Sequence, residues 1–582
     1  MEKYYLGLDI GGTWLKGIAV AIDDSTPLTA IPDKVKATKV VKVSSRLGMD
    51  AKAGDFTEAL EELLAIALPP DTKVCGTGVS TAGVVNYAGT ELVLAAPHLQ
   101  VLRKTEWIES LKKRTGAAVT LINDADAAAA GAAATGYLSG NRTIGVMPVG
   151  TGLGFTVWRN GRKWTPQFSC ALLGSIYTPS GSYDAIGGVP AILSEGENLR
   201  QIFTQPEYEV RRNAYIQHLA GIVATANIIY GTDKILIGGG LADALQQVNF
   251  PFAERLKAQL KENNLLNSAK TEVEVMREGN LLPLIGAVLL AAGEEKAQTN
   301  RSMKPYDRMN TEVPFDRTLR LEQLGTDILV RRLWKAEQDA GARLENSLGA
   351  VGEVVDKLVQ RLQAGGRLIY IGCGTSGRLA AIDTVEIGCT FGFPTDRVLT
   401  FISGGLADAA IEIESRFEED ASSVPELLLA NINANDLVIG ISVSGQAYYV
   451  QSGLGFARYA GAYTVMIQEE DVAELPFCDK VIALRTGNEL LAGSTRMKAG
   501  TATKKILNFI STAAMVRLGK VHGSYMTELK CINEKLVKRA VHILQTLFPL
   551  NAAEAEQCLK ANACELNRTI VKLNDDLHIK LH

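Results

Sequence analysis

The stretch RLIYIGCGTSGRLAAIDTVE, residues 367–386, decides the fold of the second half of this chain. The apolar run RLIYI has the length of a buried strand, and the glycine- and hydroxyl-rich turn after it leads into a segment that reads as a helix. Backbone N–H groups and the hydroxyls of Thr375 and Ser376 at a helix N-terminus favour an anion. The stretch therefore predicts a strand, a phosphate-holding loop and a helix in an α/β sheet.

Four more strand-like runs follow this one: RVLTFISGG, DLVIGISVSG, YTVMIQ and KVIAL. Helical lengths separate them, helical patterning precedes them over 319–363, and the chain is expected to be helical from 499 to its end. Hydroxyl-bearing turns also occur at 442–445 (SVSG) and 493–504 (GSTRMKAGTATK). Single turns of this kind are common helix caps, but three that each close a strand of one sheet indicate one anion pocket.

The first half of the chain alternates in the same way. Strands are expected at 4–10, 15–21, 73–79, 119–122, 143–149 and 234–237, with helical stretches such as 55–68 and 125–138 between them. This alternation predicts an α/β unit. Near residue 294 the apolar pattern stops and a polar segment with two prolines begins, which indicates an inter-domain linker. The predicted domains are 1–295, a linker at 296–310, 311–530, and a helical C-terminal subdomain at 531–582.

Three glycine clusters in the first half predict a nucleotide site: LDIGGTWLKG at 8–17, VGTGLGFTVWRNGR at 149–162 and ILIGGGLADAL at 235–245. Glycines let backbone N–H groups approach a phosphate, and a carboxylate with a hydroxyl completes a phosphate and Mg²⁺ grip. The candidate residues for binding ATP and Mg²⁺ are Asp9, Gly11, Gly12, Thr13, Gly150, Thr151, Gly152, Gly154, Gly238 and Gly239.

These clusters resemble the phosphate-1, phosphate-2 and adenosine motifs of the ROK family of actin-like sugar kinases, over about residues 1–295. The segment LINDADAAAAG, 121–131, resembles that family's catalytic segment and places Asp124 as the general base; the alternative is a helix N-cap. The resemblance implies an actin-like ATPase fold of two subdomains, with ATP and Mg²⁺ as cofactors.

Two departures from the ROK pattern concern the sugar. The family's cysteine-rich zinc motif has no counterpart near 176–195, so no structural metal is expected. The sugar-binding Gly-Glu-x-Gly-His segment corresponds to ALLGS, 171–175, where Leu172 and Ser175 replace Glu and His. Either the sugar differs at the positions that those groups read, or this half no longer phosphorylates anything.

The second half resembles the N-acetylmuramic acid 6-phosphate etherase family, a SIS-type fold, over nearly all of 310–582. The resemblance rests on the opening stretch, on ISGG and GISVSG, and above all on GSTRMKAGTATKKILNFIST. It implies cleavage of the ether between the sugar's C3 and D-lactate, without a metal or organic cofactor. In this chain SGQAYY stands where the family has SGRTPY, so Gln446 replaces an arginine and Tyr448 a proline.

The etherase resemblance also implies the site residues. Its first catalytic glutamate corresponds to Glu386, and its second lies within ESRFEED, 414–420, at Glu419, with Glu418 as the alternative. The implied phosphosugar-binding residues are Gly374, Thr375, Ser376, Ser442, Ser444, Ser494, Thr495 and Lys498, with Arg496 as the alternative to Lys498.

Together the two resemblances suggest that one site makes a sugar phosphate and the other consumes it, as in the recycling of peptidoglycan amino sugars. One alternative is a phosphosugar-sensing regulator like the glucokinase regulatory protein, which is built on similar domains but lacks catalysis. Another is an aldose–ketose isomerase, which shares the SIS fold. Both families also imply a homodimer.

Composition excludes several other classes. The net charge is −4 and no basic run with interleaved aromatics occurs, so nucleic acid is not an expected partner. No apolar run approaches the ~20 residues of a membrane span, and the N-terminus shows no leader pattern, so the chain is expected to be cytoplasmic. Its eight cysteines lack the paired close spacings of zinc sites and are expected to be free thiols.

Overall fold

The computed structural model describes residues 3–577 except 48–50, 70–71, 87, 96, 139–141, 160–161, 165–169, 263–269, 299–311, 317, 406–421, 471–474, 529–530 and 532. The chain forms two compact units. The first comprises residues 1–300 together with 420–432, and the second comprises 301–419 and 433–582. Residues 420–432, which lie between two strands of the second unit in sequence, thus belong to the first unit.

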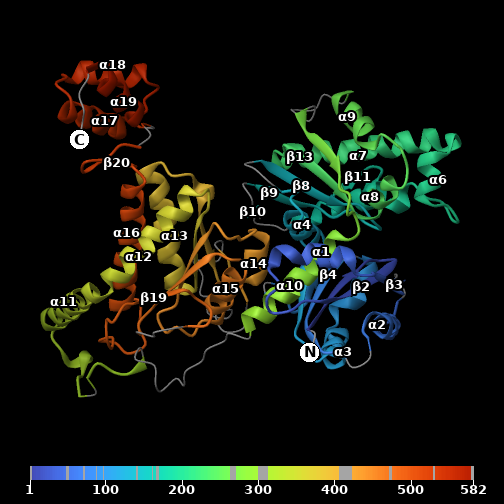
Figure 1. Ribbon diagram of the computed structural model, residues 1–582, viewed down its shortest axis with the longest axis horizontal. Coiled ribbons are helices and arrows are strands. Elements are labelled where there is room, and N and C mark those ends of the chain that lie inside the picture. The colour runs from blue at the N-terminus through green and yellow to red at the C-terminus, as the bar shows by residue number, and fades with distance from the viewer. Residues whose placement is uncertain are drawn as a thin grey trace. The chain divides into compact units, whose positions relative to one another are not determined.

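The first unit contains two five-stranded sheets of identical strand order (Figure 1). One is β3-β2-β1-β4-β7, with β1 Tyr4–Ile10, β2 Trp14–Ala21, β3 Val41–Ser44, β4 Val74–Thr81 and β7 Val119–Asn123. The other is β10-β9-β8-β13-β14, with β8 Thr143–Pro148, β9 Thr156–Arg159, β10 Arg162–Lys163, β13 Lys234–Gly238 and β14 Glu272–Val275. In each sheet an antiparallel hairpin is followed by two parallel strands. This duplication is the two-subdomain actin-like architecture that the motifs predicted.

The helices of this unit are α1 Ile31–Ala37, α2 Ala53–Ala67, α3 Glu106–Thr115, α4 Asp124–Ala134, α5 Tyr183–Gly187, α6 Leu199–Thr204, α7 Glu209–Tyr230, α8 Gly239–Gln246, α9 Phe252–Glu262, α10 Leu282–Gln298 and α14 Val424–Leu429. Short strand pairs are β5 Val84–Val85 with β6 Leu92–Leu94, and β11 Tyr177–Thr178 with β12 Gly181–Ser182. Within the described helices, none has the length and apolar character needed to cross a membrane.

Helix α10 lies against the first sheet and α4 at unusually short range. A Cβ added at Gly78 of β4 would stand 1.9 Å from the carbonyl oxygen of Ala287, and one added at Gly286 would stand 2.1 Å from that of Ala127. Both glycines are therefore required by close approach of two backbones. Because α4 begins at Asp124, this packing fixes the position of the predicted general base.

The second unit has one parallel sheet of order β16-β15-β17-β18-β19. Its strands are β15 Leu368–Gly372, β16 Val398–Ile402, β17 Leu437–Ile441, β18 Tyr463–Gln468 and β19 Lys480–Ala483, which confirms all five predicted strands. The helices are α11 Thr326–Arg343, α12 Leu348–Gln363, α13 Gly374–Phe391, α15 Tyr448–Tyr459, α16 Lys498–Arg517, α17 Glu534–Leu547, α18 Ala552–Ala561 and α19 Leu566–Leu577.

Alternating strand residues supply the two faces of this sheet. Leu368 and Tyr370 join a core with α12, α13 and α16, whereas a Cβ on Gly440 would strike Val450 and Leu454 of α15 on the other face (Figure 1). Arg367 and Asp436 form a buried bidentate ion pair that aligns the starts of β15 and β17. The sheet is thus a three-layer sandwich with its loops at one edge.

The end of the chain is not wholly helical, as the sequence had suggested. A short hairpin, β20 Val521–His522 with β21 Tyr525–Met526, precedes α17. Helices α17, α18 and α19 then bury a small core of their own, comprising Ala540, Ile543, Leu544, Phe548, Ala555, Leu559, Leu566, Ile570 and Leu573.

Candidate functional sites

The phosphate-1 and phosphate-2 loops of the first unit lie side by side. Thr13 follows β1 and Thr151 follows β8, in different sheets, yet their hydroxyl oxygens are 3.1 Å apart. The adenosine segment packs on the second of these loops, because Leu241 N–H donates to the carbonyl of Val149 and a Cβ on Gly239 would strike that same residue. Gly239 has a φ of +74°, which favours glycine. The structure therefore brings the three predicted clusters together.

Asp9, at the end of β1, is buried and held from two sides. The Ser80 hydroxyl donates to its Oδ1 at 3.0 Å, and the Lys16 ammonium donates to its Oδ2 at 3.0 Å. Lys16 also donates to Asn280 Oδ1, and the Asn280 amide in turn donates to Asp243 of α8. This chain of contacts links the phosphate-1 strand to the adenosine helix. Lys16 lies on β2 directly opposite Asp9, and it was not singled out from the sequence.

Asp124 is not the cap of α4. Asn123 is the N-cap residue, and its side chain accepts hydrogen bonds from the backbone N–H of Ala125 and Asp126. Burial and the negative charge of Asp9 raise the pKa of Asp124 to about 7. A carboxyl with a pKa near neutrality and a position at a helix start beside the phosphate loops suits proton transfer.

Asp184, on α5, is a carboxylate that sequence reasoning missed. It accepts the Leu153 N–H of the phosphate-2 loop at 2.7 Å, and its charge also raises the pKa of Asp124. A Cβ on Gly174 of the ALLGS segment would stand 2.1 Å from Asp184 Oδ1. The available signal was an aspartate in the first turn after the cap Ser182. Ser175 of the same segment is exposed, and the side chain of Leu172 lies outside the described part.

The donor set suits a Mg²⁺ ion carried on nucleotide phosphates. The negative charge of Asp9 raises the pKa of Asp124, so the two carboxyl groups lie close enough to interact beside the two hydroxyl-bearing loops. Mg²⁺ is usually held by one or two carboxylates plus substrate phosphates rather than by a full protein cage. No group of three or more His, Cys, Asp or Glu side chains that could hold a metal ion is found in the described portion of the chain.

In the second unit, the GCGTSG turn joins β15 to α13 through a close contact. A Cβ on Gly372 would stand 2.7 Å from Gly377 N, and one on Gly377 would stand 2.8 Å from the Ile402 side chain. The helix start has no side-chain cap from Cys373, its N-cap residue. Thr375 and Ser376 are half-buried in its first turn. The N–H groups of this turn are therefore directed to the carboxyl edge of the sheet.

The turn after β17 lies next to this one, since β15 and β17 are paired neighbours. Ser442 is buried and accepts the Ala447 N–H, and Ser444 accepts the Gln446 N–H. Gly445 has a φ of +75°. In this strand order the reversal of direction falls between β15 and β17, where open α/β sheets bind ligands.

The segment 493–498 is arranged differently from the prediction. Lys498 is buried, and its ammonium donates to the Thr486 carbonyl at 2.9 Å. Glu489 accepts the N–H groups of Lys498 and Ala499, so its own carboxylate caps the start of α16. Burial raises the pKa of Glu489 and lowers that of Lys498. Ser494 and Thr495 are half-buried in the preceding turn and remain candidates for phosphosugar contact.

Glu386 lies on α13 and pairs with Lys504 of α16, whose ammonium donates to its Oε2 at 2.7 Å. One turn earlier, Asp383 is buried and accepts the Tyr370 and Ser511 hydroxyls at 2.8 and 3.0 Å. Burial raises the pKa of Asp383 and also that of Tyr370. Asp383 thereby locks α13 to β15 and α16. Glu418 and Glu419 lie outside the described residues.

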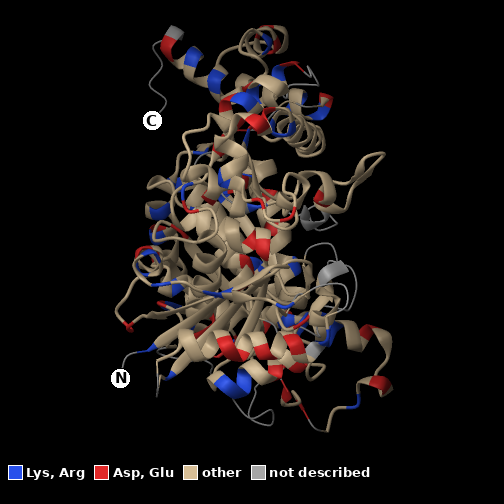
Figure 2. Ribbon diagram, turned by 90° about the vertical axis from the view of Figure 1, so that its right-hand side faces the viewer, with Lys and Arg blue, Asp and Glu red and all other residues tan. Residues whose placement is uncertain are grey.

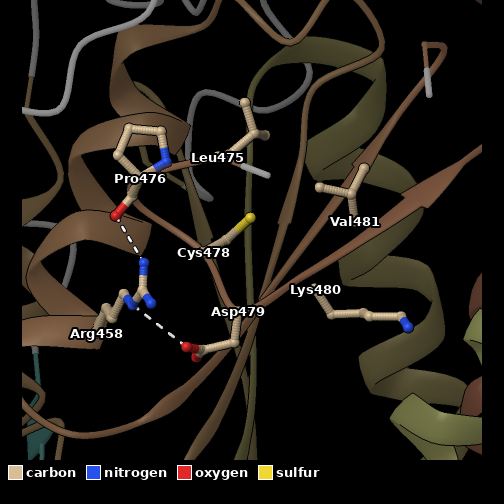
Figure 3. Close-up of a pocket in the computed structure, with 7 residues that line it drawn as sticks. All are labelled: Arg458, Leu475, Pro476, Cys478, Asp479, Lys480 and Val481. Carbon is tan, nitrogen blue, oxygen red and sulfur yellow. Dashed lines mark hydrogen bonds and ion pairs between the residues drawn. The ribbon is translucent and has the colours of Figure 1, made fainter. Parts of the chain in front are cut away.

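A surface hollow in the second unit lies at the opposite edge of the sheet (Figure 3). Cys478, Asp479 and Lys480 line it at the start of β19, and Arg458 pairs with Asp479 at 3.2 Å. Burial raises the pKa of the Cys478 thiol to about 12, which makes it a poor nucleophile. This hollow is therefore separate from the predicted phosphosugar loops. Along the ribbon in the view of Figure 2, acidic and basic residues are interspersed.

Comparison with known proteins finds relatives for both halves of the chain. Residues 5–171 match the ROK family. Residues 350–458 match the glucokinase regulatory protein N-terminal SIS domain. The C-terminal half is 35% identical, over 268 residues, to N-acetylmuramic acid 6-phosphate etherase of Geobacillus thermodenitrificans; this covers 46% of the chain and 91% of the relative. The chain belongs to the N-acetylmuramic acid 6-phosphate etherase family.

A second etherase, from Mycolicibacterium smegmatis, is 37% identical over 266 residues, or 46% of the chain and 89% of the relative. Among solved structures, a ROK family glucokinase from Streptomyces griseus in complex with glucose and AMPPNP covers 50% of the chain and 99% of its own length at 18% identity, with a TM-score of 0.40. A putative N-acetylmannosamine kinase from Listeria monocytogenes covers 50% and 97% at 19% identity and a TM-score of 0.38. The chain therefore carries a C-terminal half similar to the etherases and an N-terminal segment, residues 5–171, that matches the ROK family.

Proposed function

We propose that the etherase half cleaves the D-lactyl ether of N-acetylmuramic acid 6-phosphate, giving N-acetylglucosamine 6-phosphate and D-lactate. The observation that carries the proposal is the 35% identity to an etherase over 91% of that enzyme's length. The three hydroxyl-bearing turns, at 373–377, 442–445 and 493–496, would hold the phosphate.

The reaction needs an acid and a base. In the open-chain sugar, C2 is next to an aldehyde, so its proton is acidic enough for a carboxylate to remove; we assign this step to Glu386. The electron pair then expels lactate from C3 as the C2–C3 double bond forms, and water adds to C3 while C2 regains a proton. Glu419, or Glu418, would protonate the leaving lactate oxygen and later activate the water.

We further propose that the ROK half phosphorylates the 6-hydroxyl of the amino sugar with ATP. Asp124 would take the hydroxyl proton, and a pKa of about 7 leaves about half of the molecules with this carboxyl ionised at neutral pH. Asp9 would help to hold the Mg²⁺ ion of the nucleotide, which would supply positive charge beside the phosphates. The product of this half is then the substrate of the other, which places the chain in the recycling of peptidoglycan sugars.

One other function has a specific observation in its favour. Residues 350–458 match the glucokinase regulatory protein N-terminal SIS domain, which is named for regulation, and Gln446 stands where the etherase family has an arginine. On this reading the chain senses phosphosugars and does not convert them. Glu386 argues against it, because a sensor needs no carboxylate beside C2.

The decisive experiment measures D-lactate release by the purified chain from N-acetylmuramic acid 6-phosphate, and separately from N-acetylmuramic acid with MgATP. Lactate from both substrates supports the bifunctional enzyme. Lactate from the phosphate alone supports an etherase whose ROK half is silent or prefers another sugar. Phosphosugar binding without lactate from either supports the regulator.

A further inference from the structure

Four polar side chains form a row across the first sheet, at the carboxyl end of β1. In the strand register, Ser80 of β4 stands opposite Asp9 of β1 on one side, and Lys16 of β2 stands opposite it on the other. Lys42 of β3 stands opposite Lys16. Residues that are directly opposite on neighbouring strands share one face of a sheet. This polar row therefore lies on a single face, and the proposed function uses only Asp9 from it.

Strand β3, which carries Lys42, is bonded directly to the phosphate-1 turn. The Ser45 backbone N–H donates to the Thr13 carbonyl at 3.1 Å, and the Ser45 hydroxyl donates to the Gly12 carbonyl at 2.8 Å. Lys42 lies three residues earlier in the chain. The residue after it, Val43, is buried in the core on the opposite face of the sheet. Since successive strand residues point to opposite faces, the Lys42 side chain is directed to the face of the polar row.

The Lys42 ammonium has an aromatic ring beneath it. Its Nζ lies 3.9 Å from the centroid of the ring of Trp14, which follows Thr13 in the phosphate-1 turn and is 43% exposed. Among the described residues, no carboxylate forms an ion pair with this ammonium. Burial and the charge of Lys16 lower the pKa of Lys42, whereas the charge of Asp243 of α8 raises it. Lys42 is therefore electrostatically coupled both to the phosphate-1 strand and to the adenosine helix.

Two lysines that face each other across neighbouring strands repel, and such a pair ordinarily destabilises a sheet. In this structure the charge of Lys16 is compensated by Asp9, at 3.0 Å, and its ammonium also donates to Asn280 Oδ1. When Asp9 turns to the Mg²⁺ ion of a nucleotide, Lys16 loses this carboxylate and the two ammonium groups face each other uncompensated. An anion that contacts both lysines removes the repulsion. The phosphate tail held by the neighbouring loops is such an anion.

We propose that Lys16 and Lys42 together bind the terminal phosphates of the nucleotide, and that Lys16 exchanges the Asp9 carboxylate for a phosphate oxygen. The inference rests on the proposed kinase function and adds two binding residues to its site. An ammonium on a flexible stem is suited to such an exchange, because its three donors are not fixed in one plane. The ring of Trp14 holds Lys42 in place without a carboxylate that the phosphate would have to displace.

The test is nucleotide binding by Lys42→Met, measured by isothermal titration calorimetry with MgATP, MgADP and AMP in the absence of sugar. Loss of a charge-assisted contact should weaken the binding of MgATP and MgADP about 10- to 100-fold, and that of AMP less than about twofold. Lys16→Met should weaken the same two nucleotides, because both lysines contact the terminal phosphates. Lys42→Arg keeps the charge and the contact with the ring, so it should bind MgATP within about threefold of wild type.

The matched control is Lys113→Met, which should bind all three nucleotides as the wild type does. Lys113 is an exposed lysine of the same subdomain, but it lies on α3, whose Ile108 and Leu111 pack into the core on the opposite face of the sheet. Trp14 provides a second signal: its emission should change when MgADP draws the ammonium from its ring, and this change should be absent from Trp14→Phe.

The outcomes separate this inference from the proposed kinase function. Wild-type affinity of Lys42→Met for MgATP overturns the inference, as does an equal loss of affinity for MgATP and AMP, which would indicate a distorted pocket. A wild-type chain that binds MgATP but phosphorylates no sugar contradicts the proposed kinase function and leaves the inference standing. A wild-type chain that binds none of the nucleotides overturns both.

Discussion

The two predicted sites of this chain are built in opposite ways. In the ROK half, loops from two different sheets meet within one copy, as the 3.1 Å contact between the Thr13 and Thr151 hydroxyls shows. In the etherase half, the loop at Thr375 and the glutamate at 386 share one helix and are about 16 Å apart. Residues close in sequence are thus far apart in space, and residues far apart in sequence are in contact.

The difference teaches that a motif locates a binding loop better than it locates a catalytic group. Glycine and hydroxyl residues act through the backbone that they themselves shape. A base, in contrast, acts wherever folding and assembly place its carboxylate. Variants of single carboxylates in each half therefore test the comparison directly.

The largest effect is expected at Glu386. Replacement by Gln removes the base at C2 while keeping the side chain's shape, so D-lactate release should fall about 10³- to 10⁴-fold, at the upper end for a positioned proton transfer. Glu353→Gln is a matched control, because Glu353 is also a helical surface glutamate paired with a lysine, Lys480. Retention of more than a tenth of the activity by the Glu386 variant would remove this residue from the mechanism.

A somewhat smaller effect is expected at Asp124. Phosphoryl transfer depends mainly on positioning and on charge stabilisation, so Asp124→Asn should lower sugar-dependent ATP turnover about 10²- to 10³-fold. Nucleotide binding, followed with a fluorescent ATP analogue, should change little, because the glycine loops are untouched. Unchanged turnover would return Asp124 to a structural role beside the N-cap residue Asn123.

The sequence predicted the fold more fully than the sites. All five strands of the second sheet and the two-subdomain α/β architecture of the first unit follow from apolar runs of strand length, because burial on both faces selects such runs. The prediction did not include the hairpin β20–β21 or the membership of residues 420–432 in the first unit. Neither has a distinctive periodicity, since both are short and defined by tertiary contacts.

For the sites, the glycine loops were predictable and several polar partners were not. Lys16, Asp184 and Lys504 are each ordinary in sequence, and their partners Asp9, Leu153 and Glu386 become neighbours only through folding. Lys498 shows the reverse: the motif suggests an anion ligand, yet the folded chain directs its ammonium to the Thr486 carbonyl. The spacing of residues in the sequence does not show which side chains become hydrogen-bond partners after folding.

The next prediction concerns residues 420–432, which lie within the second half of the chain in sequence but belong to the first unit of the fold. Helix α14 packs on α10 of the first unit, where Glu294 is buried and accepts a hydrogen bond from Ser422. Burial raises the pKa of Glu294 from 4.5 to about 7. The folded state therefore retains a proton that the unfolded chain releases between these values, and its stability declines as the pH rises through that window.

Glu294→Gln should remove this decline, since the amide keeps an acceptor for Ser422 and cannot ionise. At pH 8 the variant should be more stable than wild type by about 1–3 kcal/mol, and at pH 4.5 the difference should vanish. Urea unfolding followed by tryptophan fluorescence reports mainly on the first unit, which holds Trp14, Trp107, Trp158 and Trp164. Glu254→Gln, on α9, serves as control; equal pH dependence in wild type and the Glu294 variant would contradict the interpretation.

The smallest expected effect is a shift in the pH midpoint of phosphorylation, caused by a negative charge that neighbours Asp124. With a pKa of about 7, Asp124 accepts a proton only above that pH, so kcat/KM for phosphorylation should rise through pH 7 and level off. Asp184→Asn removes one charge that raises this pKa, while its amide oxygen still accepts the Leu153 N–H. The midpoint should therefore move down by about half a unit, as expected for a partly screened neighbouring charge. Asp33→Asn, on the exposed side of α1, should leave the midpoint in place. The contrary outcome is a midpoint that stays at pH 7 in the Asp184 variant while the rate falls. Asp184 would then act on the substrate and not on Asp124. The cluster of carboxylates that distinguishes the ROK half from the etherase half would then serve substrate binding alone.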